Sequence, residues 1–113
     1  MPSKYVPDSG DIVWLDFEPQ SGHEQKGRRP ALVLSPAAYN KRVGLMVCCP
    51  MTTQIKGYPF EVRVEGAKGQ SSVVLSDQVK SLDWQARNAA RKGRASDDDL
   101  AEVLGKIKAL LRI

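Results

Sequence analysis

Short apolar runs separated by turn residues make up the first half of the chain, and this pattern predicts β-strands. Ile12 to Phe17 is rich in branched and aromatic residues and follows the turn signal Asp8-Ser9-Gly10-Asp11, so it predicts the first strand. Ala31 to Ser35 and Gly44 to Cys49 are apolar runs that predict two more strands, the second of them ended by Pro50.

The second half begins with a clear alternation. Phe60 to Glu65 alternates between apolar and polar residues, as expected of a strand with one face in water. Ser72 to Leu75 predicts the next strand, and the glycines between the two predict a hairpin. From Val79 to Trp84, we expect Val79, Leu82 and Trp84 to pack inward.

Helical signals are concentrated at the end of the chain. Ser96 is a natural N-cap, and the acids Asp97 to Asp99 suit the positive end of a helix dipole. An apolar stripe at helical spacing is expected to be core: Leu100, Val103, Leu104, Ile107, Leu110 and Leu111. A shorter helical turn is expected at Pro36 to Asn40, because proline suits the first position of a helix.

Several short strands with Gly and Pro turns, followed by one helix, predict a mainly β fold. We expect a small antiparallel barrel with a C-terminal α-helix that covers an opening of the barrel. A length of 113 residues suits one domain over residues 1–113. The chain has no apolar run of about 18 residues and no signal-peptide pattern, so we expect a cytoplasmic protein without a membrane span.

Charge and cysteine content narrow the chemistry. The net charge of +4 permits a polyanionic partner without requiring one. Cys48 and Cys49 are adjacent in an apolar run, so they should point to opposite faces of a strand and serve as packing residues without a disulfide. With one histidine and no spaced Cys/His cluster, we expect neither a metal site nor a cofactor.

The candidate chemistry is concentrated in the polar stretch from Gly22 to Arg29. It carries Glu24, the single histidine His23 and several cations, and it leads directly into the strand predicted at Ala31. Functional groups are often placed on loops that a rigid strand anchors. We therefore expect Glu24, Arg28 and Arg29 to be held in defined positions.

Five stretches distributed over nearly the whole chain match one known family in order. They are Tyr5-Val6-Pro7-Asp8-Ser9-Gly10-Asp11-Ile12-Val13-Trp14, Glu24-Gln25-Lys26-Gly27-Arg28-Arg29-Pro30-Ala31-Leu32-Val33-Leu34-Ser35-Pro36, Pro50-Met51-Thr52-Thr53-Gln54, Lys56-Gly57-Tyr58-Pro59-Phe60-Glu61-Val62 and Ser76-Asp77-Gln78-Val79-Lys80-Ser81. The chain resembles the MazF (PemK-like) toxins of type II toxin–antitoxin systems. The resemblance implies an SH3-like barrel with helical decorations, a symmetric homodimer and sequence-specific cleavage of mRNA, which inhibits translation.

The resemblance also implies catalytic residues. Arg29 and Thr52 would act at the scissile phosphate, and Glu24 would be a catalytic or other active-site residue. Cleavage without a metal needs the neighbouring 2′-hydroxyl to attack phosphorus, a proton acceptor, a proton donor and stabilisation of the phosphorane. Because an arginine pKa lies above 12, we assign Arg29 mainly to charge stabilisation, with proton donation to the leaving group as the alternative.

Residues expected to contact RNA lie in the polar stretch, in the loop from Thr52 to Tyr58 and in two further segments. They are Phe17, His23, Gln25, Lys26, Arg28, Thr53, Gln54, Lys56, Gln78, Lys80 and Arg87. The basic run from Arg87 to Arg94 is either a solvated surface or an electrostatic track for RNA. Trp14 and Phe17 are more often core residues, although Phe17 beside the loop could stack on an unpaired base.

Other residues also have plain structural alternatives. Glu24 with Arg28 or Arg29 could form only a surface ion pair, worth less than about 1 kcal/mol. His23 is either a proton shuttle or, as we favour, a solvent-exposed or RNA-contacting side chain. Trp84 is expected to be a core or dimer contact.

Two functions remain as hypotheses. The first is an endoribonuclease toxin that cleaves single-stranded RNA and is inhibited by a MazE-like antitoxin, whose acidic flexible tail would fold in the same basic groove. The second is a non-catalytic barrel that acts on a protein target, as the gyrase-poisoning CcdB toxins do. Those poisons end in Trp-Gly-Ile, whereas this chain ends Leu110-Leu111-Arg112-Ile113. The intact Arg29 and Thr52 favour cleavage.

Overall fold

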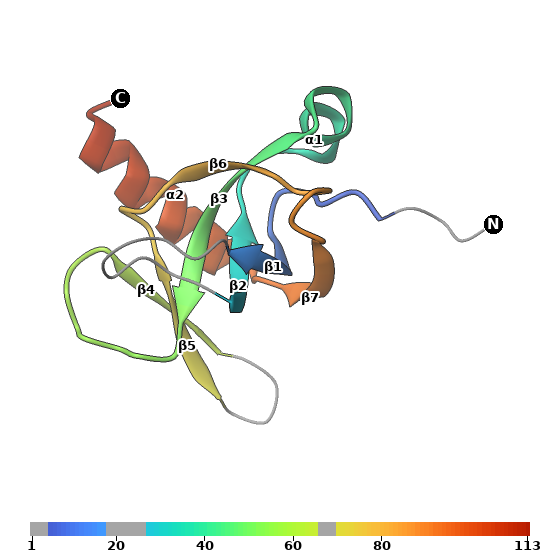
Figure 1. The fold of residues 1–113 in the computed structure, drawn as a ribbon. Coiled ribbons are helices and arrows are strands. Elements are labelled where there is room, and N and C mark those ends of the chain that lie inside the picture. The colour runs from blue at the N-terminus through green and yellow to red at the C-terminus, as the bar shows by residue number, and fades with distance from the viewer. Residues whose placement is uncertain (1–4, 18–26, 66–69) are drawn as a thin grey trace.

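A computed structural model of the chain describes residues 5–17, 27–65 and 70–113. These residues form seven strands and two helices, arranged mainly as an antiparallel sheet with a helix at the C-terminus (Figure 1). In chain order the elements are β1 (Asp11–Phe17), β2 (Gly27–Val33), α1 (Ala37–Val43), β3 (Leu45–Thr52), β4 (Glu61–Glu65), β5 (Ser71–Leu75), β6 (Lys80–Asp83), β7 (Ala90–Arg94) and α2 (Asp97–Leu111).

The strand order is β4-β5-β3-β2-β1-β7, and β6 pairs with β3 beside this path. All of these pairings are antiparallel. The long strand β3 lies at the centre, because it pairs in turn with β6, β2 and β5 along its length. The prediction of a mainly β, antiparallel barrel with a C-terminal helix is confirmed, in the form of a half-barrel (Figure 1).

β3 continues through Pro50 instead of ending there. Pro50 lies opposite Ala31 of β2, and Met51 lies opposite Val74 of β5. Proline lacks an amide hydrogen, so a strand tolerates it where the hydrogen-bond ladder is interrupted. The predicted end of this strand is wrong because β3 changes partner at Pro50 and then runs on to Thr52.

β2 begins earlier than its apolar residues indicate. It runs from Gly27 to Val33, so Arg28 and Arg29 belong to the strand and not to the preceding loop. The cause is pairing with β1, in which Arg28 lies opposite Asp16 and Arg29 opposite Leu15. The helical turn after β2 is also longer than predicted, since α1 extends to Val43.

The apolar residues form two clusters on the two faces of the sheet. The first contains Ile12, Leu32, Cys49, Met51, Val62, Val64, Val74, Ala95, Val103 and Ile107. The second contains Val13, Leu15, Phe17, Ala31, Val33, Met46, Cys48 and Trp84. The two cysteines therefore lie on opposite faces, as predicted, and burial raises the pKa of each thiol to about 12, which fits a packing role.

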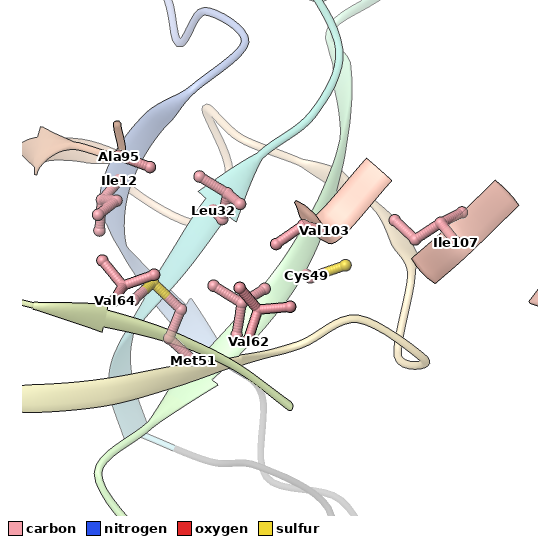
Figure 2. Packing of buried hydrophobic residues seen from close by; sticks show 10 residues of the cluster. Ile12, Leu32, Cys49, Met51, Val62, Val64, Ala95, Val103 and Ile107 are labelled. Carbon is pink, nitrogen blue, oxygen red and sulfur yellow. The ribbon is translucent and has the colours of Figure 1, made fainter. Parts of the chain in front are cut away.

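α2 packs against the first cluster through part of its stripe. Val103 and Ile107 are buried, and in Figure 2 Ile107 lies at one end of the cluster with Ile12 and Val64 at the other. The predicted N-cap is confirmed, because Ser96 Oγ accepts a hydrogen bond from the Asp99 amide at 3.1 Å.

The rest of the stripe does not join the core. Leu104, Leu110 and Leu111 are 42%, 44% and 58% exposed, so the prediction that the whole stripe is core is wrong. The buried positions Val103 and Ile107 are one helical turn apart, which shows that the sheet contacts a narrower face of the helix than the stripe offers.

Two further segments differ from expectation. β7 lies within the basic run and was not predicted, because Ala90–Arg94 does not alternate between apolar and polar residues. This strand forms by pairing with β1. An ion pair supports the pairing, since Arg94 Nη1 lies 3.0 Å from Asp11 Oδ1. Val79 was expected to pack inward but is 42% exposed, since it precedes β6, whereas Trp84 is buried in the second cluster as predicted.

Candidate active site

A cavity of about 320 Å³ lies among β1, β2, β3, β4, β5 and β7. It is lined by Ile12, Trp14, Arg28, Arg29, Pro30, Met51, Thr52, Thr53, Val64, Glu65, Gln70, Ser71, Ser72 and Lys92. The structure thus brings together two residues that the sequence separates widely, Arg29 of β2 and Thr52 of β3. Of the predicted site residues, Arg28 and Thr53 line the same cavity.

The sheet explains how these two residues meet. Arg29 lies opposite Leu15, a fully buried residue, so the backbone that carries Arg29 is fixed to the core through β1. Thr52 is the last residue of β3 and lies opposite Val73 of β5. Its hydroxyl oxygen accepts a hydrogen bond from the Gln54 amide at 3.1 Å. Because a hydroxyl both accepts and donates, the Thr52 proton remains able to reach a phosphate oxygen.

Arg28 is held at the rim of the cavity by two contacts. Its guanidinium donates to Asp16 Oδ1 at 2.9 Å and to the carbonyl oxygen of Asn88 at 2.8 Å. Asn88 Nδ2 in turn donates to Asp16 Oδ2 at 2.8 Å. The hydrogen bonds from Asn88 and from Arg28 both lower the pKa of the Asp16 carboxyl. Among the described residues, Arg28 is therefore paired with Asp16.

Trp14 is not a core residue, contrary to expectation. Its side chain is 36% exposed and lines the cavity, and Lys92 Nζ lies 5.3 Å from the centroid of its ring. Val13 and Leu15, its neighbours in β1, are buried in the second cluster, so Trp14 faces the other side of the strand. Strand alternation beside two core residues was the available sequence signal for this placement.

Other lining residues were not predicted either. Glu65, Ser71 and Ser72 come from the paired strands β4 and β5, and Ser71 Oγ donates to the Glu65 carboxylate at 3.1 Å. No sequence motif marks these residues, because their position depends on how β5 pairs with β3. The apolar lining residues Ile12, Met51 and Val64 belong to the first core cluster.

A loop with several predicted RNA contacts follows β3. The Glu61 carboxylate accepts the amides of Lys56 at 3.0 Å and Gly57 at 2.7 Å. Tyr58 donates its hydroxyl proton to Asp77 at 2.8 Å, and burial together with this hydrogen bond raises the pKa of Tyr58 to about 12. From α2, Lys106 Nζ donates to the Pro59 carbonyl at 2.6 Å. These contacts fix the backbone of the loop.

Comparison with known proteins identifies the family. Residues 8–111 match the family model described as PemK-like, MazF-like toxin of type II toxin-antitoxin system. The chain belongs to this family. It is 50% identical over 111 residues to the protein named endoribonuclease toxin MazF from Escherichia coli K12, covering 98% of this chain and 99% of that protein. It is 39% identical over 108 residues to endoribonuclease toxin ChpB of the same strain, covering 90% and 91%.

Solved structures agree with the family. A MazF crystal structure from Deinococcus radiodurans has a TM-score of 0.89 at 58% identity, covering 97% of this chain and 100% of that one. A MazE–MazF structure from the same organism has a TM-score of 0.88 at 58% identity, covering 97% and 99%. In the described part of this MazF-like toxin, no helix has the length and apolar character needed to cross a membrane.

Five other predicted site residues that the structure describes do not line the cavity. Gln54 and Lys56 are exposed on the loop after β3, and Gln78 is exposed on the turn after β5. Lys80 is half-buried on β6, and Arg87 is half-buried with Nη1 donating to the Asp16 carbonyl at 3.2 Å. None of these side chains lines the cavity that holds Arg29 and Thr52.

Phe17 is 6% exposed and packs in the second cluster of the toxin, so its ring is not available for base stacking in this conformation. The structure therefore favours the core alternative for Phe17. His23, Glu24, Gln25 and Lys26 lie outside the described residues. Within residues 5–17, 27–65 and 70–113, no group of three or more His, Cys, Asp or Glu side chains is arranged to hold a metal ion.

Proposed function

We propose that this toxin is an endoribonuclease that cleaves single-stranded RNA without a metal ion. The observation that carries the proposal is the cavity shared by Arg29 and Thr52, in a chain whose family model covers residues 8–111. The relatives named endoribonuclease toxin MazF and ChpB support the same activity. With mRNA as substrate, the toxin would act in the cytoplasm, inhibit translation and arrest growth.

In the proposed reaction, the 2′-hydroxyl oxygen attacks the adjacent phosphorus and loses its proton to a general base. A new P–O2′ bond forms, and the P–O5′ bond breaks after a phosphorane-like transition state. The leaving 5′-oxygen takes up a proton. The products are a 2′,3′-cyclic phosphate and a 5′-hydroxyl end, so the RNA itself supplies the nucleophile and no metal-bound water is required.

Arg29 is assigned to stabilisation of the phosphorane. A guanidinium stays charged at any physiological pH and offers forked N–H donors that match two phosphate oxygens. The Thr52 hydroxyl is assigned to a third interaction, donation to a non-bridging oxygen. We propose Glu24 as the general base or as another active-site group, on the family resemblance of the polar stretch that carries it.

Single-stranded RNA is the expected substrate because the strand must bend into the cavity and present its bases. Unstacked bases expose hydrogen-bonding edges that a protein can read, and the 2′-hydroxyl requirement excludes DNA. The exposed Gln54 and Lys56 of the loop after β3 are candidates for contacts to the RNA outside the cavity, since the contacts from Glu61 keep that loop ordered.

We propose two protein partners. The first is a MazE-like antitoxin, a partner supported by the solved MazE–MazF structures of relatives at 58% and 56% identity. We propose that it covers the cavity with an acidic segment, because the lining has an excess of positive charge. A second copy of the toxin would form a homodimer. The exposed apolar side chains Leu104, Leu110, Leu111 and Ile113 at the end of the chain support such self-association.

The test is digestion of a long single-stranded RNA in EDTA with wild-type protein, Arg29→Ala and the control Arg63→Ala. Arg63 is exposed on β4 and does not line the cavity, so it matches the loss of charge without touching the site. We expect cuts with 5′-hydroxyl ends for wild type and Arg63→Ala, loss of cutting for Arg29→Ala, and no cutting of a 2′-deoxy substrate. Intact RNA with folded wild-type protein would instead favour the non-catalytic, protein-targeting alternative.

A further inference from the structure

We propose that the Trp14 side of the cavity is a nucleobase subsite, in which a base flanking the scissile phosphate stacks on the indole ring. This inference rests on the proposed ribonuclease function and extends it. Its starting point is the position of Trp14. A tryptophan that is 36% exposed, on a strand whose adjacent residues Val13 and Leu15 are fully buried, has its ring directed into the cavity and not into the core.

The neighbouring strands leave the Trp14 side chain 36% exposed. Trp14 lies opposite Pro30 of β2 on one side and opposite Ala90 of β7 on the other. Both cross-strand partners are small, so neither can cover an indole ring. In the same cavity, the lining residues Ile12 and Met51 supply apolar surface that belongs to the core. The apolar face of a flat aromatic group can therefore lie against the exposed part of Trp14.

Size and charge also fit a nucleotide. The cavity measures about 320 Å³, near the lower end of the roughly 300–1,000 Å³ that small-ligand sites occupy. Arg28, Arg29 and Lys92 line it together with one carboxylate, Glu65. Although Arg28 is paired with Asp16, the lining keeps an excess of positive charge, which suits a phosphodiester. Because Arg29 and Trp14 line the same cavity, a strand whose phosphate contacts Arg29 places an adjoining base near the indole ring.

Lys92 is part of this subsite. Its ammonium group lies 5.3 Å from the centroid of the Trp14 ring, which keeps a cation over the aromatic face before RNA arrives. Stacking of a base on an aromatic side chain is the stronger interaction, so the base displaces the ammonium group from the ring. Lys92 also lines the cavity, and once displaced it can contact the phosphate of the same nucleotide.

The test combines protein and RNA substitutions. Wild type, Trp14→Ala and Trp14→Phe are assayed on an RNA with one cleavable motif, with the flanking nucleotides replaced one at a time by abasic residues. For wild type, we expect the abasic residue at the subsite to lower kcat/KM about 5- to 160-fold, the range of base–aromatic stacking. For Trp14→Ala, we expect a similar loss with the intact RNA and no further loss with the abasic RNA. Trp14→Phe should retain most of the activity and the sensitivity to the abasic residue.

A binding measurement separates stacking from a structural role. The chain has two tryptophans, so Trp84→Phe leaves Trp14 as the fluorescent reporter. A 2′-deoxy RNA that cannot be cut should quench Trp14 fluorescence, and the abasic version should not.

Equal abasic penalties in wild type and Trp14→Ala, or no quenching despite RNA binding, would overturn the subsite while leaving the ribonuclease intact. Absence of cleavage by folded wild-type protein would overturn the proposed function itself.

Discussion

Arg28 Nη1 lies 2.9 Å from Asp16 Oδ1, and this pair joins β1 to β2 immediately beside Arg29. The pair is not isolated, because Asn88 donates to the second oxygen of the same carboxylate and accepts from Arg28 through its carbonyl oxygen. Asp16 thus connects β1, β2 and the turn before β7. The strand segment that presents Arg29 to the cavity is fixed by this network and not only by backbone hydrogen bonds.

The network makes stability depend on pH in the acid range. The pKa of Asp16 is lower in the folded protein than in the unfolded chain, so its contribution is fully present above the unfolded value of about 3.9 and is lost as pH falls through the lower folded value. We expect Asp16→Asn to reduce the loss of Tm seen between about pH 4 and pH 2. Thermal unfolding of both proteins across this range is the measurement, and identical pH profiles would contradict the assignment.

The same network predicts an effect on catalysis. Because Arg28 and Asp16 hold the strand that carries Arg29, Asp16→Asn should lower cleavage at neutral pH more than it lowers RNA affinity. Asp83→Asn is the control, since Asp83 is exposed at the end of β6 and does not line the cavity. A mutant with unchanged kcat would show that the backbone pairing of β1 and β2 alone fixes Arg29.

The Thr52 hydroxyl can be tested with isosteric substitutions. Thr52→Val keeps the shape of the side chain and removes both the acceptor for the Gln54 amide and the proposed donor to phosphate. We expect cleavage to fall about 10²- to 10³-fold, as when one donor to a developing oxyanion is lost. Thr52→Ser should retain most of the rate. The comparison is made by single-turnover cleavage with the toxin in saturating excess over the RNA, so that the cleavage step is measured separately from binding and product release.

Sequence patterns predicted the elements whose signals are local. Ser96 and the acids after it predicted the start of α2. The alternation from Phe60 to Glu65 predicted β4, because one face of that strand is buried and the other faces water. β7 lacked such a signal. Its residues are Ala, Arg, Lys and Gly, and it becomes a strand only because β1 offers an edge and Asp11 offers a partner for Arg94. A short stretch of sequence shows no periodic pattern that reveals pairing with a strand far away in the chain.

The site was predictable in part for the same reason. Arg29 and Thr52 were identified from motifs, but their shared cavity depends on β3 changing partner at Pro50, which placed Thr52 beside β5. Trp14 was assigned to the core because aromatic residues in an apolar run usually pack there. The burial of both its neighbours on the other face, together with its place in the cavity lining, shows that it faces the cavity.

The Glu61 carboxylate holds the loop after β3, so a substitution that removes this carboxylate should make the loop more mobile. The two carboxylate oxygens of Glu61 accept the amides of Lys56 and Gly57, and Gly57 has a φ of 84°, a conformation that the loop needs at this turn. In Glu61→Ala, we expect faster hydrogen exchange at these two amides and a higher KM for RNA with little change in kcat. Glu102→Ala is the control, because Glu102 is exposed on α2 and does not line the cavity. Glu65→Ala is unsuitable, because Glu65 lines the cavity. Unchanged exchange at Lys56 and Gly57 would show that the loop is held by its other contacts.

The exposed end of α2 predicts self-association. Leu110 and Leu111 are 44% and 58% exposed, and burying such side chains on a second copy removes apolar surface from water. We expect Leu111→Lys to weaken the proposed dimer without loss of fold, because Leu111 contributes nothing to the core that Val103 and Ile107 form. Sedimentation equilibrium gives the dissociation constant, with Lys108→Glu on the same helix as the control. An unchanged dimer in Leu111→Lys would place the interface elsewhere, and a monomeric wild type would remove the homodimer from the mechanism altogether.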